Sequence, residues 1–171
     1  MQEITALIRN IPDFPEPGIQ FKDITPLMKE PKALKLAVLE LIKPFINEDI
    51  NYVAGMEARG FIFGSLAAAE LGVGFIPLRK PGKLPYDVKS LSYDLEYGSA
   101  SLEIHTDAVD SADRILLIDD LIATGGTAAA SCQLIEQAGG EIAGCAFVIE
   151  LDFLNGREKL ANHQVHSLIH Y

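Results

Sequence analysis

The fold is decided by the stretch RILLIDDLIATGGTAAA, which runs from Arg114 to Ala130. It begins with an apolar run bounded by charge, which predicts a buried strand of residues 114–118. Two adjacent carboxylates, Asp119 and Asp120, stand where that strand is expected to end. A Gly/Thr turn at 123–127 then leads into alanine-rich sequence, which is typical of the start of a helix.

The turn after the acidic pair has the composition of a phosphate-binding loop. Glycines let backbone N–H groups approach an anion, threonine hydroxyls add donors, and a helix N-terminus adds partial positive charge. Carboxylates would repel the phosphate itself but can accept hydrogen bonds from ribose hydroxyls close by. We therefore expect a ribose 5-phosphate site formed by Asp119, Asp120, Ala123, Thr124, Gly125, Gly126 and Thr127. Each motif alone could be a helix cap or a solvated acidic pair, and neither a Walker loop nor a GxGxxG loop is present.

Length and charge limit the class of protein. A chain of 171 residues, 49% of them hydrophobic, is long enough for one domain with a substantial core. The net charge of −10 argues against nucleic acid as the main partner. The N-terminus lacks the apolar region of a signal peptide and no apolar run reaches membrane-spanning length, so we expect a cytoplasmic protein without a membrane partner. Cys132 and Cys145 are expected to be buried apolar residues rather than disulfide partners.

Hydrophobic periodicity predicts strands that alternate with helices. Helices are expected at 3–9, 31–46, 61–71 and 125–138. Strands are expected at 51–55, 74–78, 90–96, 100–105, 114–118, 142–151 and, as an edge strand, 165–171. This order predicts an α/β fold whose mainly parallel sheet is flanked by helices. Five prolines exclude a regular element from 11–31, but the apolar residues between them favour an ordered segment over disorder.

In a parallel sheet, ligands bind at the carboxyl ends of the strands, so the loops 56–60, 79–85 and 119–127 are expected to meet. The second loop contains three basic residues, Arg79, Lys80 and Lys83, in a protein that is otherwise acidic. This local charge favours binding of a polyanion such as pyrophosphate over a merely solvated surface. Arg59 could add a guanidinium, although 56–60 could equally be a plain helix N-terminus with Glu57 compensating the helix dipole.

Glu96 and the histidines are weaker candidates for a site. Polar and apolar residues alternate over 89–109, with Gly98 near the centre, which suggests a hairpin or a mobile excursion between the two strands expected there. Glu96 lies at its turn, and it could be a carboxylate on a loop that closes over a substrate or a solvated side chain. The four histidines show no metal-ligand spacing and are expected at surface or edge positions; they are His105, His163, His166 and His170.

Six motifs occur in a familiar order: DFPEPGIQFKDITPL, GMEARGFIFG, RKPGKLP, LEYG, IDDLIATGGT and GREKL, the last at residues 156–160. Over nearly the whole chain they resemble the adenine phosphoribosyltransferase family of type I phosphoribosyltransferases. The resemblance implies a single type I phosphoribosyltransferase-like domain over residues 1–171. It also implies a small N-terminal hood of about residues 1–30 over the base site, a homodimer, and Mg²⁺ held through substrate and water rather than by direct protein ligands.

The activity that the resemblance implies is purine salvage by transfer of the 5-phosphoribosyl group from phosphoribosyl pyrophosphate to N9 of adenine, which gives AMP and pyrophosphate. Glu96, which would take the proton from N7, and Arg59 are then expected to be catalytic. The pyrophosphate would be held by Arg59, Arg79, Lys80 and Lys83, and the adenine by Ile19, Gln20, Phe21 and Lys22. Lys22 stands where arginine is expected, which leaves open whether its main chain or its side chain meets the base.

Two other functions remain open at this point. One is a phosphoribosyltransferase for hypoxanthine, guanine or orotate, against which DFPEPG and LEYG weigh. The other is a non-catalytic sensor of phosphosugars, which would need a nucleic-acid-binding surface that the acidic charge argues against.

Overall fold

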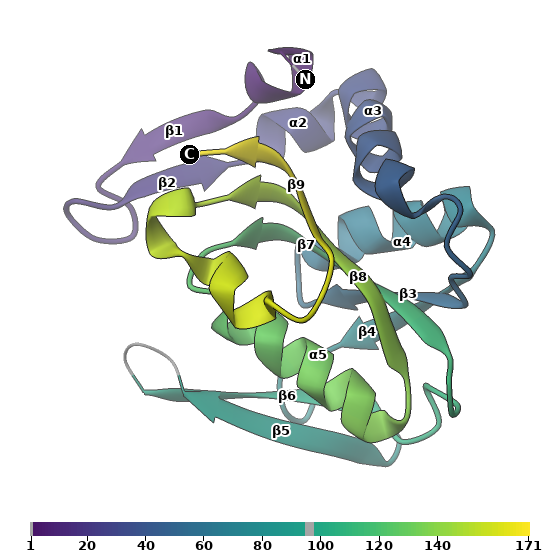
Figure 1. Cartoon of the computed structure of the whole chain (residues 1–171). Helices are drawn as coiled ribbons and strands as arrows, with labels where there is room; N and C mark the ends of the chain where they lie inside the picture. The colour runs from purple at the N-terminus through teal and green to yellow at the C-terminus, as the bar shows by residue number, and fades with distance from the viewer. Residues whose placement is uncertain (1, 95–97) are drawn as a thin grey trace.

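A five-stranded parallel sheet forms the centre of the structure, a computed structural model that describes residues 2–94 and 98–171 (Figure 1). The strand order is β4-β3-β7-β8-β9, and every neighbouring pair is parallel. The strands are β3 (Tyr52–Met56), β4 (Gly74–Leu78), β7 (Arg114–Ile122), β8 (Glu141–Glu150) and β9 (Val165–His170). The expected α/β fold with a mainly parallel sheet is confirmed, and β9 is the edge strand that the sequence predicts.

Helices cover one face of the sheet, and a helix with a β-hairpin covers the other. The first face is covered by α1 (Gln2–Thr5), α2 (Thr25–Lys29), α3 (Pro31–Ile42) and α4 (Gly60–Leu71). The second face is covered by α5 (Gly126–Ala138) and by the antiparallel pair β5 (Val88–Asp94) and β6 (Ser99–His105). Successive residues of β7 alternate between the two layers: Leu116 packs against the first layer and Leu117 against the second.

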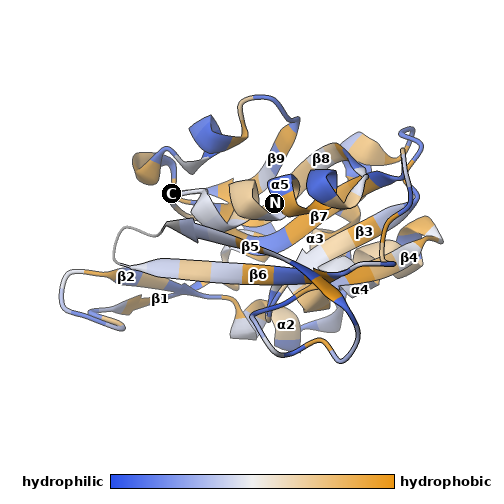
Figure 2. Ribbon diagram, turned by 90° about the horizontal axis from the view of Figure 1, so that it is seen from below, coloured by the Kyte–Doolittle hydropathy of each residue, from blue (hydrophilic) through white to orange (hydrophobic). Residues whose placement is uncertain are grey.

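Because both faces are covered, the strands of the sheet carry long apolar runs, and Figure 2 shows hydrophobic colour over much of the sheet. This burial explains why 114–118 has the sequence of a continuous apolar run. No helix within the described part of the chain is both long enough and apolar enough to cross a bilayer.

Strand β7 is longer than the sequence predicts, and the acidic pair lies inside it. On one side β7 pairs with β3 only as far as Ile118. On the other side it pairs with β8 as far as Ile122. The expectation that the strand ends before Asp119 is therefore wrong, because pairing with β8 continues after β3 has ended. The last four residues of β7 form the edge of a notch beside the end of β3.

The N-terminal segment is more regular than expected. The helix predicted at 3–9 ends at Thr5, because i→i+3 hydrogen bonds at Leu7 and Ile8 tighten the turn that follows. The segment 11–31, predicted to lack regular elements, contains the end of β1 (Arg9–Pro12), all of β2 (Gln20–Asp23) and all of α2. Its prolines are tolerated because they lie at strand ends, in the connecting loop or in the first turn of a helix.

Buried Asp23 fixes this hairpin to α2. Its carboxylate accepts hydrogen bonds from Arg9 Nη2, at 2.6 Å, and from the N–H and hydroxyl of Thr25. The Thr25 N–H above all, together with Arg9, lowers the Asp23 pKa below its usual value. The hairpin and α2 therefore form one ordered unit.

The remaining predicted elements are confirmed with small changes in their bounds, except that the last two residues of the strand predicted at 90–96 lie outside the described residues. Gly139, at φ 113°, ends α5 as expected, since only glycine adopts this conformation without strain. Both cysteines are buried and free, with their sulfur atoms 3.6 Å apart. The sequence did not predict the three short 3₁₀ turns η1 (Lys43–Phe45), η2 (Asp152–Leu154) and η3 (Gly156–Leu160).

The core beneath α3 provides a test of the fold. Phe45 is fully buried, whereas its neighbour Ile46 is 58% exposed. Phe45→Ala should lower the free energy of unfolding by about 3–5 kcal/mol, because it leaves a cavity against β8. Ile46→Ala, the matched control, should change it by less than about 0.5 kcal/mol. Urea denaturation of both variants measures the difference, and equal losses would contradict this packing.

Candidate functional site

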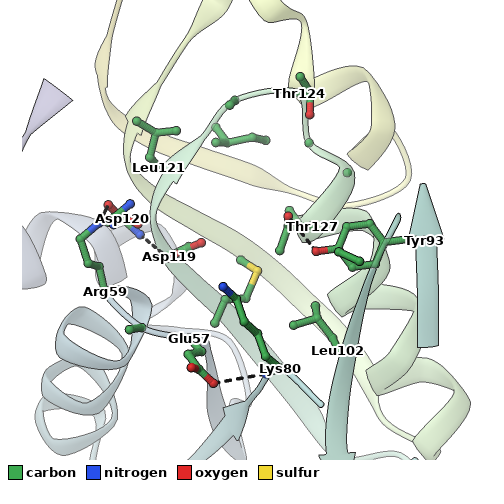
Figure 3. A pocket seen from close by; sticks show the side chains of 18 of the residues that line it. Glu57, Arg59, Lys80, Tyr93, Leu102, Asp119, Asp120, Leu121, Thr124 and Thr127 are labelled. Atoms are coloured by element: carbon green, nitrogen blue, oxygen red, sulfur yellow. Dashed lines mark hydrogen bonds and ion pairs between the residues drawn. The ribbon is translucent and has the colours of Figure 1, made fainter. Parts of the chain in front are cut away.

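A cleft of about 580 Å³ lies at the carboxyl ends of β3, β4 and β7, where the sequence predicts a ligand site (Figure 3). Four segments line it. These are residues 56–59 after β3, 80–81 after β4, 119–128 from β7 into α5, and Tyr93 with 100–102 from the β5–β6 hairpin. The convergence of the loops after three neighbouring strands is therefore confirmed.

The Gly/Thr turn forms one wall of the cleft. Gly125, at φ 74°, precedes the first residue of α5, so the backbone of 124–127 curves around the positive end of the helix dipole. Thr124 and Thr127 are both lining residues. The Thr127 hydroxyl accepts a hydrogen bond from Tyr93 Oη at 3.1 Å, which links the turn to β5 (Figure 3). This wall has the chemistry of a site for a phosphate group.

Asp119 and Asp120 form the acidic part of the cleft, and they have different environments. Asp120 is buried and makes an ion pair with Arg59 across the notch, with 2.5 Å between Oδ2 and Nε. Asp119 Oδ1 accepts the backbone N–H of Asp120 at 2.8 Å. Gly60, the first residue of α4, lies so close that a Cβ there would be 2.7 Å from Asp119 Oδ1. A side chain at 60 would therefore displace this carboxylate.

The environment of Asp119 disfavours its charged form. One edge of the side chain faces the cleft, but protein atoms surround the carboxyl group. Desolvation, followed by repulsion from Asp120, raises the pKa of Asp119 well above its usual value, against the smaller effect of Arg59. A carboxyl group in a cleft whose pKa is raised by desolvation and by a neighbouring charge is a candidate functional residue, and its burial lowers the stability of the fold.

The basic loop supplies one lining cation among the described residues, Lys80. Its backbone N–H donates to Glu57 Oε2 at 3.2 Å, and Arg79 Nε donates to the same oxygen at 3.1 Å. Burial would raise the pKa of Glu57, but these hydrogen bonds and the nearby cations lower it below its usual value. Arg79 also donates to the Lys83 carbonyl oxygen. Arg79 and Lys83 do not line the cleft, so their expected contact with pyrophosphate stays a prediction.

The expected base-binding residues lie in the β1–β2 hairpin and outside the lining of the cleft. Phe21 packs edge-on against Phe14, with their ring centres 5.1 Å apart. Lys22 Nζ lies 3.5 Å from the centre of the Tyr171 ring and donates to Asn10 at 2.7 Å. The roles of Ile19, Gln20, Phe21 and Lys22 toward a base remain predictions. Glu96 lies outside the described residues.

Sequence reasoning missed three parts of the site. Glu57, taken as a possible dipole partner, joins the basic loop to the end of β3. Tyr93 and Leu102 line the cleft from the hairpin, and their only sequence signal was the polar–apolar alternation of that stretch. Which side of a hairpin faces a distant loop depends on packing that alternation does not encode.

A second hollow lies between the ends of β8 and β9 and the turns η2 and η3. Within the described ranges, the one group of three potential metal ligands is here: Glu150, Asp152 and His170. Of the four histidines, His166 and His170 lie on the edge strand β9, as expected. His170 is exposed, and His105, His163 and His166 are half-buried. Both oxygens of Glu150 are held by Arg157, which neutralises the group that a cation would need.

Fold and cleft together have the features of the α/β proteins that bind phosphorylated sugars: a turn of the anion-binding type, an acidic pair and a cation lie around one cavity at the carboxyl edge of a parallel sheet. Comparison with known proteins agrees with this class. The phosphoribosyl transferase domain family matches residues 23–166. Adenine phosphoribosyltransferase of Methylococcus capsulatus is 67% identical over 171 residues, which is the full length of both chains.

Solved structures show the same similarity. The crystal structure of adenine phosphoribosyltransferase from Rhodothermus marinus is 51% identical, with a TM-score of 0.95 over 99% of this chain and 97% of that one. The Saccharomyces cerevisiae enzyme, complexed with an imino-altritol bisphosphate and adenine, is 42% identical, with a TM-score of 0.92 over 98% and 97% of the two chains. The chain belongs to the adenine phosphoribosyltransferase family.

The buried Asp119 generates a prediction about stability and pH. Asp119→Asn should raise the free energy of unfolding at neutral pH, because it removes a desolvated charge while the amide oxygen of the new side chain still accepts the Asp120 N–H. A raised folded-state pKa means that the wild type loses stability as pH rises, so the gain should shrink as pH falls toward the range in which free aspartate titrates.

Thermal unfolding of wild type and Asp119→Asn between pH 4 and 8 measures this difference, with the exposed Asp49→Asn as control. A variant that is less stable than wild type at pH 8 would contradict the assigned environment of Asp119.

Proposed function

We propose that this chain transfers the 5-phosphoribosyl group of phosphoribosyl pyrophosphate to N9 of adenine, giving AMP and pyrophosphate in purine salvage. Family membership supports the reaction, and one observation in the structure carries the assignment of its parts. The acidic pair lies on β7 and the phosphate-type turn follows directly after this strand, and both line the same cleft as Lys80.

In this proposal each end of the donor substrate has its own part of the cleft. The backbone N–H groups and hydroxyls of 123–127 bind the 5-phosphate, with the α5 dipole behind them. Asp119 and Asp120 accept hydrogen bonds from the ribose hydroxyls. Lys80 and Arg59 lie across the cleft from the turn, near where the pyrophosphate leaves, and Arg79 and Lys83 belong to the same loop. Cleavage at C1 develops oxocarbenium character, which carboxylates beside the ribose stabilise electrostatically.

Mg²⁺ fits this site as an ion held by the substrate. The oxygens nearest the ribose are those of Asp119 and Asp120, and Asp120 is already neutralised by Arg59. The described part of the cleft holds no group of three potential protein ligands. We therefore expect these two residues to hold Mg²⁺ through water and ribose hydroxyls, where it offsets the charge on the pyrophosphate.

The base is proposed to bind under the hairpin. In Figure 1 the β1–β2 hairpin lies beyond the carboxyl ends of β7 and β8. The residues that line the cleft also follow the carboxyl ends of strands of this sheet. Ile19 to Lys22 would read the adenine edge, with Phe21 against the ring. When N9 attacks C1, the base becomes a stronger acid at N7, and Glu96 is proposed to take that proton. A homodimer in the cytoplasm is part of the same proposal, by analogy with the family.

A product assay tests the reaction. Wild-type protein with phosphoribosyl pyrophosphate and Mg²⁺ should form AMP and pyrophosphate with adenine, and no nucleotide above background with hypoxanthine, guanine or orotate. Chromatography of the products measures this directly. Turnover of another base with greater efficiency than adenine would contradict the proposal, and binding without turnover of any base would favour a sensor of phosphosugars.

The role of Lys80 gives a second test. Lys80→Ala should lower the affinity for pyrophosphate and for phosphoribosyl pyrophosphate roughly ten- to hundredfold, because a charged hydrogen-bond partner is lost. AMP affinity should change little, because AMP lacks the group that Lys80 is proposed to hold. The loop should keep its place, because the backbone N–H of residue 80 can still donate to Glu57. Isothermal titration with each ligand gives the affinities, and the exposed Lys32→Ala on α3 is the control. Equal losses for AMP and pyrophosphate would show that the loop is structural.

A further inference from the structure

Residues 156–160, the GREKL motif, form η3 and lie behind the phosphate-type turn. Gly156 is buried against it: a Cβ at this position would overlap the carbonyl oxygen of Ala123 and would lie 2.8 Å from the backbone nitrogen of Gly125. Conversely, a Cβ on Gly125 would overlap the carbonyl oxygen of Gly156. The two backbone segments are therefore in direct contact, with no room for a side chain on either.

Three attachments hold this segment in place. Arg157 makes a bidentate ion pair with Glu150 at the end of β8, through Nε at 2.9 Å and Nη2 at 2.5 Å. Its Nη1 donates to the Val165 carbonyl oxygen of β9 at 2.8 Å. Leu160 is 1% exposed and packs into the core beneath α5. Because the guanidinium is a rigid fork, this pairing fixes direction as well as distance.

The attachment point is itself part of the site's framework. Glu150 is the strand partner of Ile122, the residue just before Ala123, and the Leu151 N–H donates to the Ile122 carbonyl oxygen. The Glu150 carboxylate is buried, and Arg157 above all lowers its pKa below the usual value, so the pair stays charged at neutral pH. Arg157 belongs to the second hollow and does not line the phosphosugar cleft, so it acts without touching the ligand.

We propose that Gly156 and Arg157 are positioning residues for the 5-phosphate: η3 is the support that sets the direction of the turn's backbone N–H groups. This inference rests on the proposed function, because it assumes that 123–127 bind the phosphate. Misplacement of a functional group by about 1 Å can lower enzyme activity on the order of a hundredfold. We therefore expect that a small shift of this support is enough to lower the affinity for the ligand.

Gly156→Ala tests the contact, with Gly144→Ala as the matched control. A Cβ on Gly144 would overlap the ring of Phe45, in the core on the far side of β8 from the cleft. Both variants should lower the melting temperature, but only Gly156→Ala should lower the affinity for ribose 5-phosphate, by roughly ten- to hundredfold. Pyrophosphate affinity should be unchanged in both. Titration calorimetry with ribose 5-phosphate and with pyrophosphate measures the four affinities.

Arg157→Lys tests the bidentate pairing of Arg157 with Glu150. It also tests the positioning role independently, if Gly156→Ala does not fold. Lysine keeps the charge beside Glu150 but loses the bidentate geometry and the bond to Val165. We expect a raised KM for phosphoribosyl pyrophosphate with little change in kcat. The control is Arg114→Lys, whose pairing with Glu48 is on the protein surface at the opposite end of β7.

The results separate the two proposals. Wild-type protein that binds no ribose 5-phosphate would overturn the assigned phosphate site and this inference with it. Wild-type protein that binds it, with Gly156→Ala or Arg157→Lys binding equally well, would overturn only the positioning role. Parallel losses of ribose 5-phosphate and pyrophosphate in these variants would show a general loss of structure and would also overturn it.

Discussion

The site depends on unequal pairing of one strand: β7 pairs with β3 as far as Ile118 but with β8 as far as Ile122. Pairing with β8 keeps Asp119 and Asp120 in extended geometry while leaving their other side unpaired at the end of β3. The start of α4 occupies this space. Gly60 permits the helix to lie close to Asp119, and Arg59 makes an ion pair with Asp120. If β7 ended with β3, the acidic pair would lie in a loop, and its geometry relative to the turn that follows would not be fixed.

The cleft sets short-range groups that favour anions within an acidic protein. With a net charge of −10, long-range electrostatics oppose a phosphorylated ligand. Short-range groups oppose this effect at each end of the cleft: the N-terminus of α5 at the turn, and Lys80 and Arg59 across from it. The carboxylates lie between them, where a ribose has hydroxyl donors rather than charge. In the proposed function, this order of groups matches the 5-phosphate, the ribose hydroxyls and the pyrophosphate of phosphoribosyl pyrophosphate.

The sequence predicts the parts of this structure that depend on local pattern. Apolar runs predicted the parallel strands, because strands that are buried on both faces have continuous apolar sequence. Glycines predicted the turn before α5 and the end of this helix. Contacts between distant segments were not predictable in this way. The length of β7 depends on its register with β8, the β1–β2 hairpin depends on the pairing of Arg9 with Asp23, and the place of η3 depends on Gly156 meeting Ala123. The family resemblance marked GREKL as a motif. Only the structure shows which residues this motif contacts.

The most direct test of this account is a crystal structure of the protein with AMP. The account predicts the phosphate at the backbone N–H groups of 124–127 and the ribose hydroxyls within hydrogen-bonding distance of the Asp119 and Asp120 carboxylates, with η3 in contact with the turn. A phosphate bound instead at Lys80, with the ribose directed away from the acidic pair, would contradict it.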